Sequence, residues 1–286
     1  WIGCTKVSPG CDNCYASVST PARSMRIVWG AGQPRHRTSA QNWKTPEFWN
    51  GQHEAFKATH GRRRRVFCAS LADVFDNEVP NQWRSDLFAL IDRTPNLDWL
   101  LLTKRVGNVL PMLLEIGRDR LPVNVWQGIS AVNQDEARRD LPKLARIEAT
   151  VRWVSYEPAL GELDLFDSVM TKDGPRQLIE GLDWVIAGGE SGPKARPIKR
   201  EWVDLLREQC DRCGVAFFFK QWGGASATAG GCDLNGHEVN IANPARARRQ
   251  GIGMVFQHFS LFETLTVAEN IALVLDERFD RPGLSL

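Results

Sequence analysis

From Val66 onward, the chain alternates short apolar runs with amphipathic stretches. The apolar runs are rich in β-branched and aromatic residues and predict six strands, at residues 65–69, 97–102, 124–128, 152–155, 184–187 and 216–219. Apolar residues at helical spacing predict four helices between them, at residues 82–93, 106–116, 135–146 and 201–212. Strands that alternate with helices of this length form βαβ units around a parallel sheet. With one more strand cut short at the N-terminus, the pattern predicts the α/β class and a partial or full TIM-like parallel βα barrel.

The segment before residue 65 lacks a clean period, so we expect helices and long loops there that cover the site. Polar residues follow each predicted strand, in clusters at 70–73, 103–105, 128–130, 156–158, 188–191 and 220–222. In βα barrels, the carboxyl ends of the strands meet at one rim and carry the site. We therefore expect a polar pocket at this rim, with Lys104, Glu157 and Lys220 as candidate catalytic residues. Two of these also have a structural interpretation, because Lys104 fits a surface cation and Glu157, before proline, fits a strand end.

Three cysteines, Cys4, Cys11 and Cys14, form a C-x6-C-x2-C array. Thiolates are the ligands that select zinc or iron–sulfur clusters. The Ser-Pro-Gly turn at residues 8–10 can fold the first thiol back onto the other two. A structural zinc site has four protein ligands, whereas a four-iron cluster held by three cysteines leaves one iron open. We expect these three thiols to bind a metal centre, and loop cysteines without a metal are the alternative.

A second Cys-x-x-Cys pair, Cys210 and Cys213, offers another zinc hypothesis. Together with Cys11 and Cys14 it has the spacing of a four-thiolate site. Its place at the end of a predicted helix favours packing and capping instead, because positions three apart share one face of a helix.

The composition and the cysteine count favour a reducing cellular compartment. The chain has 286 residues, of which 43% are hydrophobic, and a formal net charge of +2. Seven cysteines are an odd number, which argues against complete disulfide pairing and favours a reducing compartment. No charged and apolar leader opens the sequence, and the longest apolar runs, at 99–102 and 215–219, are too short to cross a bilayer. We expect a cytoplasmic protein without membrane insertion.

Positive charge gathers near the N-terminus. Residues 1–65 contain eleven Lys and Arg against three Asp and Glu, a net of +8, which leaves −6 for the rest. A basic region beside a reactive centre suits an anionic partner such as nucleic acid. For the four arginines at 62–65, the alternative is a solvated surface. The five histidines form no metal pattern, and hydrolase motifs are absent from the sequence.

Several segments resemble one protein family. They are GCTKVSPGCDNCYA at 3–16, Glu157-Pro158, AGGESGP at 187–193, ARP at 195–197 and FFFKQWG at 217–223. Together they are similar to an uncharacterised phage-associated, radical-SAM-like family of three-cysteine proteins, over about residues 1–240. The resemblance implies a radical-SAM-type barrel with a [4Fe-4S] cluster on Cys4, Cys11 and Cys14. It also implies S-adenosylmethionine, which binds the fourth iron through its amino and carboxylate groups and is cleaved reductively to a 5′-deoxyadenosyl radical.

The resemblance also implies cofactor-binding residues. The Gly188-Gly189-Glu190 turn resembles the glycine-rich contact of such enzymes to the methionine moiety, although here it follows a late strand. Glu190 and Ser191 would hold the amino group or the ribose of the cofactor, and Ser130 is a further candidate.

Substrate and electron supply follow from the same resemblance. Lys104, Arg105 and Lys220 would position an anionic substrate, and a reductant protein would be a partner. The array departs from the C-x3-C-x2-C spacing usual in radical-SAM enzymes, and Asn13 stands where an aromatic residue normally precedes the last cysteine.

The last part of the chain has a different character. Residues 223–231 have the Gly, Ala, Ser and Thr composition of a linker. Residues 251–274 resemble the glutamine-loop segment of ABC-transporter ATPases, which implies that Gln257 senses magnesium and the γ-phosphate. The stretch through Phe262 and Val267 would lead into a helical subdomain that meets a membrane partner. The chain has no Gly-x4-Gly-Lys-[Ser/Thr] phosphate loop, so this piece is expected not to hydrolyse ATP unaided.

Three domains follow: a three-cysteine radical-SAM-like barrel at 1–222, a linker at 223–244 and a truncated ABC-ATPase-like segment at 245–286. The leading functional hypothesis is a radical S-adenosylmethionine iron–sulfur enzyme that acts on an anionic substrate. A non-catalytic zinc- or cluster-bearing module that binds nucleic acid or a partner is the alternative. A third hypothesis is an ATP-binding fragment, with an ABC-type membrane partner only if the segment belongs to a functional ATPase.

Overall fold

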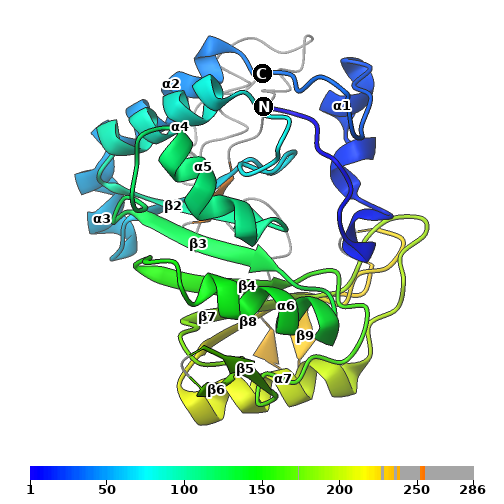
Figure 1. Ribbon diagram of the computed structural model, residues 1–286. Coiled ribbons are helices and arrows are strands. Elements are labelled where there is room, and N and C mark those ends of the chain that lie inside the picture. Colours follow the sequence, from blue (N-terminus) through cyan, green and yellow to red (C-terminus); the bar gives the residue numbers. More distant parts are fainter. Residues whose placement is uncertain (173, 227–228, 235–236, 239–251, 255–286) are drawn as a thin grey trace, which may run out of the picture.

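A single parallel sheet organises the molecule (Figure 1). The computed structural model describes residues 1–172, 174–226, 229–234, 237–238 and 252–254. Neighbouring strands in the sheet follow the order β11-β1-β2-β3-β4-β7-β8, and every pair is parallel. Their bounds are Ile252–Met254 for β11, Arg64–Cys68 for β1, Leu97–Thr103 for β2, Val125–Ser130 for β3, Val151–Tyr156 for β4, Trp184–Gly188 for β7 and Ala216–Gln221 for β8.

The six strands from β1 to β8 that belong to this sheet form a curled half-barrel, which confirms the prediction of a mixed α/β fold with a partial parallel βα barrel. All six predicted strands are present. Most extend one or two residues beyond their predicted carboxyl ends, because the polar residues there still take part in the ladder.

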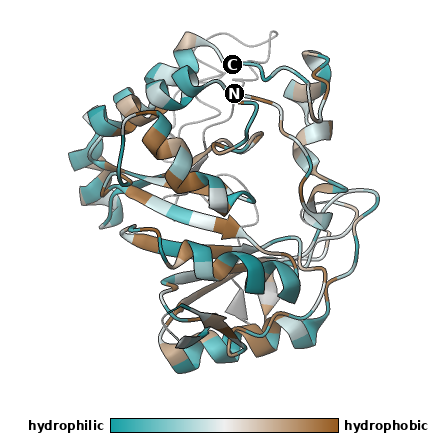
Figure 2. Cartoon of the chain, viewed as in Figure 1, coloured by the Kyte–Doolittle hydropathy of each residue, from teal (hydrophilic) through white to brown (hydrophobic). Residues whose placement is uncertain are grey.

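Helices follow the strands as predicted. They are α4 (Asn81–Arg93) after β1, the short 3-10 turn Val106–Asn108 and α5 (Val109–Glu115) after β2, α6 (Gln134–Leu144) after β3, and α7 (Arg200–Cys213) after β7. Each has mixed polar and apolar surfaces (Figure 2). Their apolar side chains join those of the strands in one core, where Val66, Leu101, Val125, Val154 and Val185 are buried. Successive side chains of a strand point to opposite faces, and the register between neighbouring strands aligns these five residues, so they all belong to the helix-covered face of the sheet.

The opposite face of the sheet carries an aromatic cluster. The rings of Trp153 and Trp184 have centroids 5.5 Å apart, and the guanidinium of Arg65 lies 4.6 Å from the centroid of Trp126. Gly128 makes room for this packing, since a Cβ there would lie 2.2 Å from the Trp153 ring.

The arginine run at 62–65 is not a simple solvated face. The guanidinium of Arg64 lies 4.2 Å from the ring centroid of Phe56, and Arg65 stacks in the aromatic cluster. Arginine stacks readily on aromatic faces.

The N-terminal third contains short helices and long loops, as expected. The helices are α1 (Thr20–Ser24), α2 (Ala40–Gly51) and α3 (His53–His60), with 3-10 turns at Pro9–Cys11 and Tyr15–Val18. The expected strand at the start of the chain is not part of the sheet. Ile2 instead forms an isolated antiparallel bridge with His36. The seventh position is taken instead by β11, which pairs with β1.

Two short hairpins were not predicted. One pairs β5 (Ser168–Thr171) with β6 (Gly174–Gln177), and the other pairs β9 (Asp233–Leu234) with β10 (His237–Glu238). Both are antiparallel and separate from the main sheet. In the β5–β6 hairpin Met170 is 80% exposed, so hydrophobic patterning gave no signal for it.

Within the described residues, no helix has the length and apolar character needed to cross a membrane. The expected glutamine-loop residues Gln257, Phe262 and Val267 lie outside the described residues.

Candidate functional site

The cysteine loop, residues 3–15, lies at the carboxyl ends of the strands (Figure 1, blue). Its central turn begins at Ser8, whose hydroxyl accepts a hydrogen bond from the backbone N–H of Gly10 at 3.0 Å, and Pro9 has the backbone angle that suits the first position of such a turn. Gly10 packs closely against the residues that follow β3 and β4, since a Cβ there would lie 2.7 Å from Val132 and 3.3 Å from Pro158. The loop is therefore delivered to the rim where the sequence placed the site.

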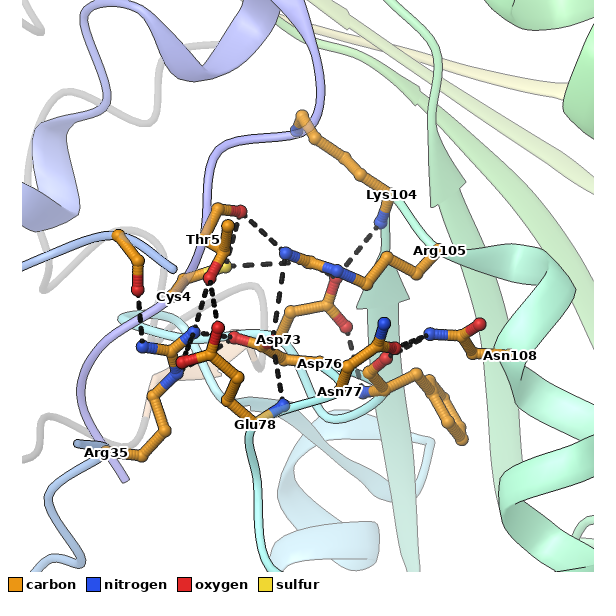
Figure 3. A network of polar contacts seen from close by, with 12 residues as sticks. Cys4, Thr5, Arg35, Asp73, Asp76, Asn77, Glu78, Lys104, Arg105 and Asn108 are labelled. Atoms are coloured by element: carbon orange, nitrogen blue, oxygen red, sulfur yellow. Dashed lines mark hydrogen bonds and ion pairs between the residues drawn. The ribbon is translucent and has the colours of Figure 1, made fainter. Parts of the chain in front are cut away.

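Arg105, just after β2, holds the first part of this loop (Figure 3). Its guanidinium donates to the backbone carbonyl of Thr5 at 2.6 Å, to the sulfur of Cys4 at 3.5 Å and to Asp73 at 2.9 Å. Asp73 is held in turn by the hydroxyl of Thr103 at 3.0 Å and the backbone N–H of Phe75 at 2.9 Å.

A second arginine, Arg35, also contacts the cysteine loop, at Thr5. Arg35 and Asp76 form an ion pair at 2.7 Å whose side chains are 0% and 2% exposed. Arg35 also donates to the hydroxyl of Thr5 at 2.6 Å (Figure 3). Sequence analysis missed this pair, because its members lie 41 positions apart and each has an ordinary local context.

The other end of the cysteine loop is held at the end of β7 by Glu190. Its carboxylate accepts hydrogen bonds from Arg196 at 2.7 and 2.9 Å and from the amide of Asn13 at 3.0 Å. Arg196 also donates to the carbonyl of Pro9 at 3.0 Å. Burial alone would raise the pKa of Glu190, but the hydrogen bonds from Arg196 and Asn13 outweigh it and hold the pKa below its usual value. We call Asn13, Glu190 and Arg196 the loop clamp.

The three predicted catalytic residues lie on one connected path. Lys104 donates from its ammonium group to the hydroxyl of Ser130 at 2.8 Å, and that hydroxyl donates to the backbone carbonyl of Glu157 at 3.2 Å. Lys220 forms an ion pair with the Glu157 carboxylate at 3.0 Å. This pair passes over Gly188, where a Cβ would lie 2.7 Å from the carboxylate oxygen.

Four of the predicted cofactor-binding residues, Gly188, Gly189, Glu190 and Ser191, lie at or just after the end of β7, whereas Ser130 is the last residue of β3. Gly189 fits tightly against the backbone of Trp222, because a Cβ there would lie 2.0 Å from the Trp222 carbonyl oxygen. Ser191 accepts a hydrogen bond from the amide of Gln221 at 2.7 Å. These contacts explain the glycines and the serine structurally, and their role toward S-adenosylmethionine stays a prediction.

The cysteine thiols themselves are all free, and Cys4, Cys11 and Cys14 are each partly exposed. Burial raises the pKa of Cys4 to about 12, although the neighbouring Arg105 acts in the opposite direction. Because a metal binds the thiolate, Arg105 is the group that favours the ligating form of Cys4.

The donor chemistry of the loop fits an iron–sulfur cluster, since three thiols lie on one short loop at the strand ends. In the part of the chain that the structure describes, no three His, Cys, Asp or Glu side chains are placed to hold a metal ion, and this includes Cys210 and Cys213 with the cysteine loop. The thiolates of a four-iron cluster bind different iron atoms and therefore do not converge on a single ion.

The chain belongs to the family described as "Protein of unknown function (DUF5131)", whose model matches residues 1–259.

Short segments of the chain are also similar to import ATPases. Guanosine import ATP-binding protein NupO of Bacillus subtilis (strain 168) is 55% identical over 40 residues, which are 14% of this chain and 8% of that protein. Methionine import ATP-binding protein MetN is 45% identical over 51 residues in Myxococcus xanthus (strain DK1622), 17% of this chain and 16% of that protein. In Protochlamydia amoebophila (strain UWE25) it is 52% identical over 48 residues, 16% of this chain and 14% of that protein.

This chain therefore spans less than a fifth of the length of these ATPases. Their short matches support the expected ATPase-like segment and nothing larger. No solved structure matches the chain significantly.

Proposed function

We propose that this chain is a radical S-adenosylmethionine-type iron–sulfur enzyme that acts on an anionic substrate. The observation that carries the proposal is the attachment of the cysteine loop to the strand ends at two points, by Arg105 after β2 and by Glu190 after β7. This attaches the loop that carries the three thiols to the strand ends of a parallel half-barrel, at the rim where βα barrels carry their chemistry.

Cys4, Cys11 and Cys14 would hold the cluster. When bound, a four-iron cluster on three thiolates has one iron free to bind S-adenosylmethionine and supplies the electron for its cleavage. The loop clamp and Arg105 keep the loop in place, and the half-barrel positions the substrate.

Lys104 is the residue best suited to bind an anionic group of the substrate. Its ammonium group contacts a neutral hydroxyl, Ser130, whereas the ammonium of Lys220 is paired with the carboxylate of Glu157. A cation that contacts only a neutral group can still form a charge-assisted hydrogen bond to an anionic ligand. A cation that is already paired with a carboxylate attracts such a ligand less strongly.

The test is anaerobic reconstitution of the whole chain with iron and sulfide. We expect about four irons and four sulfides per chain, and formation of 5′-deoxyadenosine after reduction in the presence of S-adenosylmethionine. Alanine at Cys4, Cys11 or Cys14 should abolish both. Cys213→Ala is the matched control, because that thiol is exposed and lies on α7.

Failure to assemble a cluster, or a cluster that forms equally well without these thiols, would overturn the proposal. One tightly held zinc ion and no 5′-deoxyadenosine would instead favour the non-catalytic metal-bearing module.

A further inference from the structure

The guanidinium of Arg105 lies between the cysteine loop and a fixed carboxylate (Figure 3). One terminal nitrogen, Nη1, is 2.9 Å from Asp73 and 3.5 Å from the sulfur of Cys4. The other, Nη2, is 2.6 Å from the carbonyl oxygen of Thr5. The side chain is only 9% exposed, so these contacts replace its hydration.

Asp73 fixes the direction of this guanidinium. Its Oδ2 also accepts from the hydroxyl of Thr103 at 3.0 Å and from the backbone N–H of Lys104 at 3.3 Å. Its Oδ1 accepts from the backbone N–H of Phe75 at 2.9 Å. Because the carboxylate is held by several donors, Arg105 has one well-defined orientation toward the sulfur.

We propose that Arg105 is a positioning residue that donates a hydrogen bond to Cys4 while this sulfur ligates the cluster, and that it thereby raises the reduction potential of the cluster. The inference rests on the proposed function. Reduction adds negative charge to a cluster and its sulfur ligands, and a guanidinium N–H directed at one of those sulfurs stabilises that charge. The negative charge of Asp73 offsets part of this effect.

The test compares midpoint potentials of reconstituted wild type, Arg105→Gln, Arg105→Lys and Asp73→Asn, measured by spectroelectrochemical titration at one pH. At the midpoint potential of the wild type, we expect Arg105→Gln to lower the ratio of reduced to oxidised cluster about tenfold, which corresponds to about 59 mV for a one-electron couple. Arg105→Lys keeps the charge and should recover part of this loss, although lysine cannot span three acceptors. Asp73→Asn should shift the potential in the opposite direction, because it removes the opposing charge and keeps Arg105.

A purely structural role predicts a different pattern. If Arg105 only ordered the loop, Arg105→Gln and Asp73→Asn would both loosen it and lower the iron content, with potentials that move together or not at all. Arg93→Gln is the control for loss of a distant positive charge, since Arg93 pairs with Glu47 at the surface and is 59% exposed.

Opposite shifts for Arg105→Gln and Asp73→Asn, with partial recovery in Arg105→Lys, support the inference. An unchanged potential in a stably loaded Arg105→Gln protein, or an Asp73→Asn potential that does not rise, overturns it and leaves the proposed function intact. Failure of the wild type to assemble a cluster overturns both.

Discussion

Glu157 and Lys220 form an ion pair at 3.0 Å that bridges the ends of β4 and β8 across β7. The strand between them has Gly188 at the crossing point, so no side chain separates the two. The pair leaves Lys104 as the cation of this path whose ammonium contacts a neutral hydroxyl.

Anion binding should therefore depend on Lys104 more than on Lys220. We expect Lys104→Met to weaken binding of inorganic pyrophosphate about tenfold, or about 1.4 kcal/mol, because one charge-assisted contact is lost. Lys220→Met should change the affinity less than about threefold, since its charge is already compensated. Isothermal titration calorimetry of the two variants checks this, and equal losses in both would contradict it.

Gly128 should not tolerate a methyl group. An added Cβ would lie 2.2 Å from the buried Trp153 ring, so Gly128→Ala should lower the free energy of unfolding by about 3 kcal/mol. Gly51→Ala makes the same chemical change at the end of α2, where nothing lies within 4 Å, and should be neutral or stabilising by up to about 1 kcal/mol. Urea denaturation of both variants gives the comparison, and a mild effect at Gly128 would show that the indole can move aside.

The buried pair beneath the cysteine loop should be important for stability. Arg35→Met removes the nearest cation of the buried Asp76 and leaves Arg105, which is 3.8 Å away, so it should cost about 3 kcal/mol of unfolding free energy. Addition of Asp76→Asn to this variant should recover part of the loss, because it removes a buried charge that the more distant Arg105 compensates only in part. Arg93→Met, which breaks a surface pair whose side chains are 59% and 44% exposed, should cost less than about 1 kcal/mol. Losses of equal size at Arg35 and Arg93 in urea denaturation would contradict this account.

Acid should release the loop clamp. The pKa of Glu190 lies below its ordinary value of 4.5, so the ionised carboxylate stabilises the folded state. That stabilisation is fully present above the ordinary value and is lost as the pH falls through the lowered pKa. Wild type should therefore lose more unfolding free energy between about pH 6 and about pH 3 than Glu190→Gln, which cannot ionise. Parallel pH profiles for the two proteins would show that Glu190 contributes nothing to this dependence.

Much of the sheet could be predicted because each strand is a short apolar run followed by polar residues. Helices α4 and α7 were predicted to within one residue at each end, since their apolar spacing is regular. The β5–β6 hairpin could not be found this way, because only Val169 of its strands packs against the core and Met170 is exposed. The edge strand β11 also escaped prediction, because its pairing with β1 depends on a segment about 190 residues away.

The candidate site was predicted in part. The position of Lys104, Ser130, Glu157 and Lys220 on one path follows from the rule that parallel strands end at one rim. The partners of Glu190 could not be predicted, because Asn13 is 177 positions distant and Arg196 belongs to an irregular segment.

Lys104 and Arg105 are adjacent cations after the same strand, so the sequence alone does not distinguish their roles. They contact different neighbours, Ser130 in one case and the cysteine loop in the other, because they leave the strand end in different directions. Only the three-dimensional arrangement separates an anion-binding role from a loop-holding one.

The loop clamp also has a consequence for biosynthesis. Cys4, Cys11 and Cys14 are translated more than 170 residues before Glu190 and Arg196. At about 5–20 residues per second this interval lasts roughly 10–40 s. During that time the nascent thiols lack the clamp and are exposed to oxidants and stray metal ions, so any metal loading of this loop is expected to follow synthesis of the clamp residues.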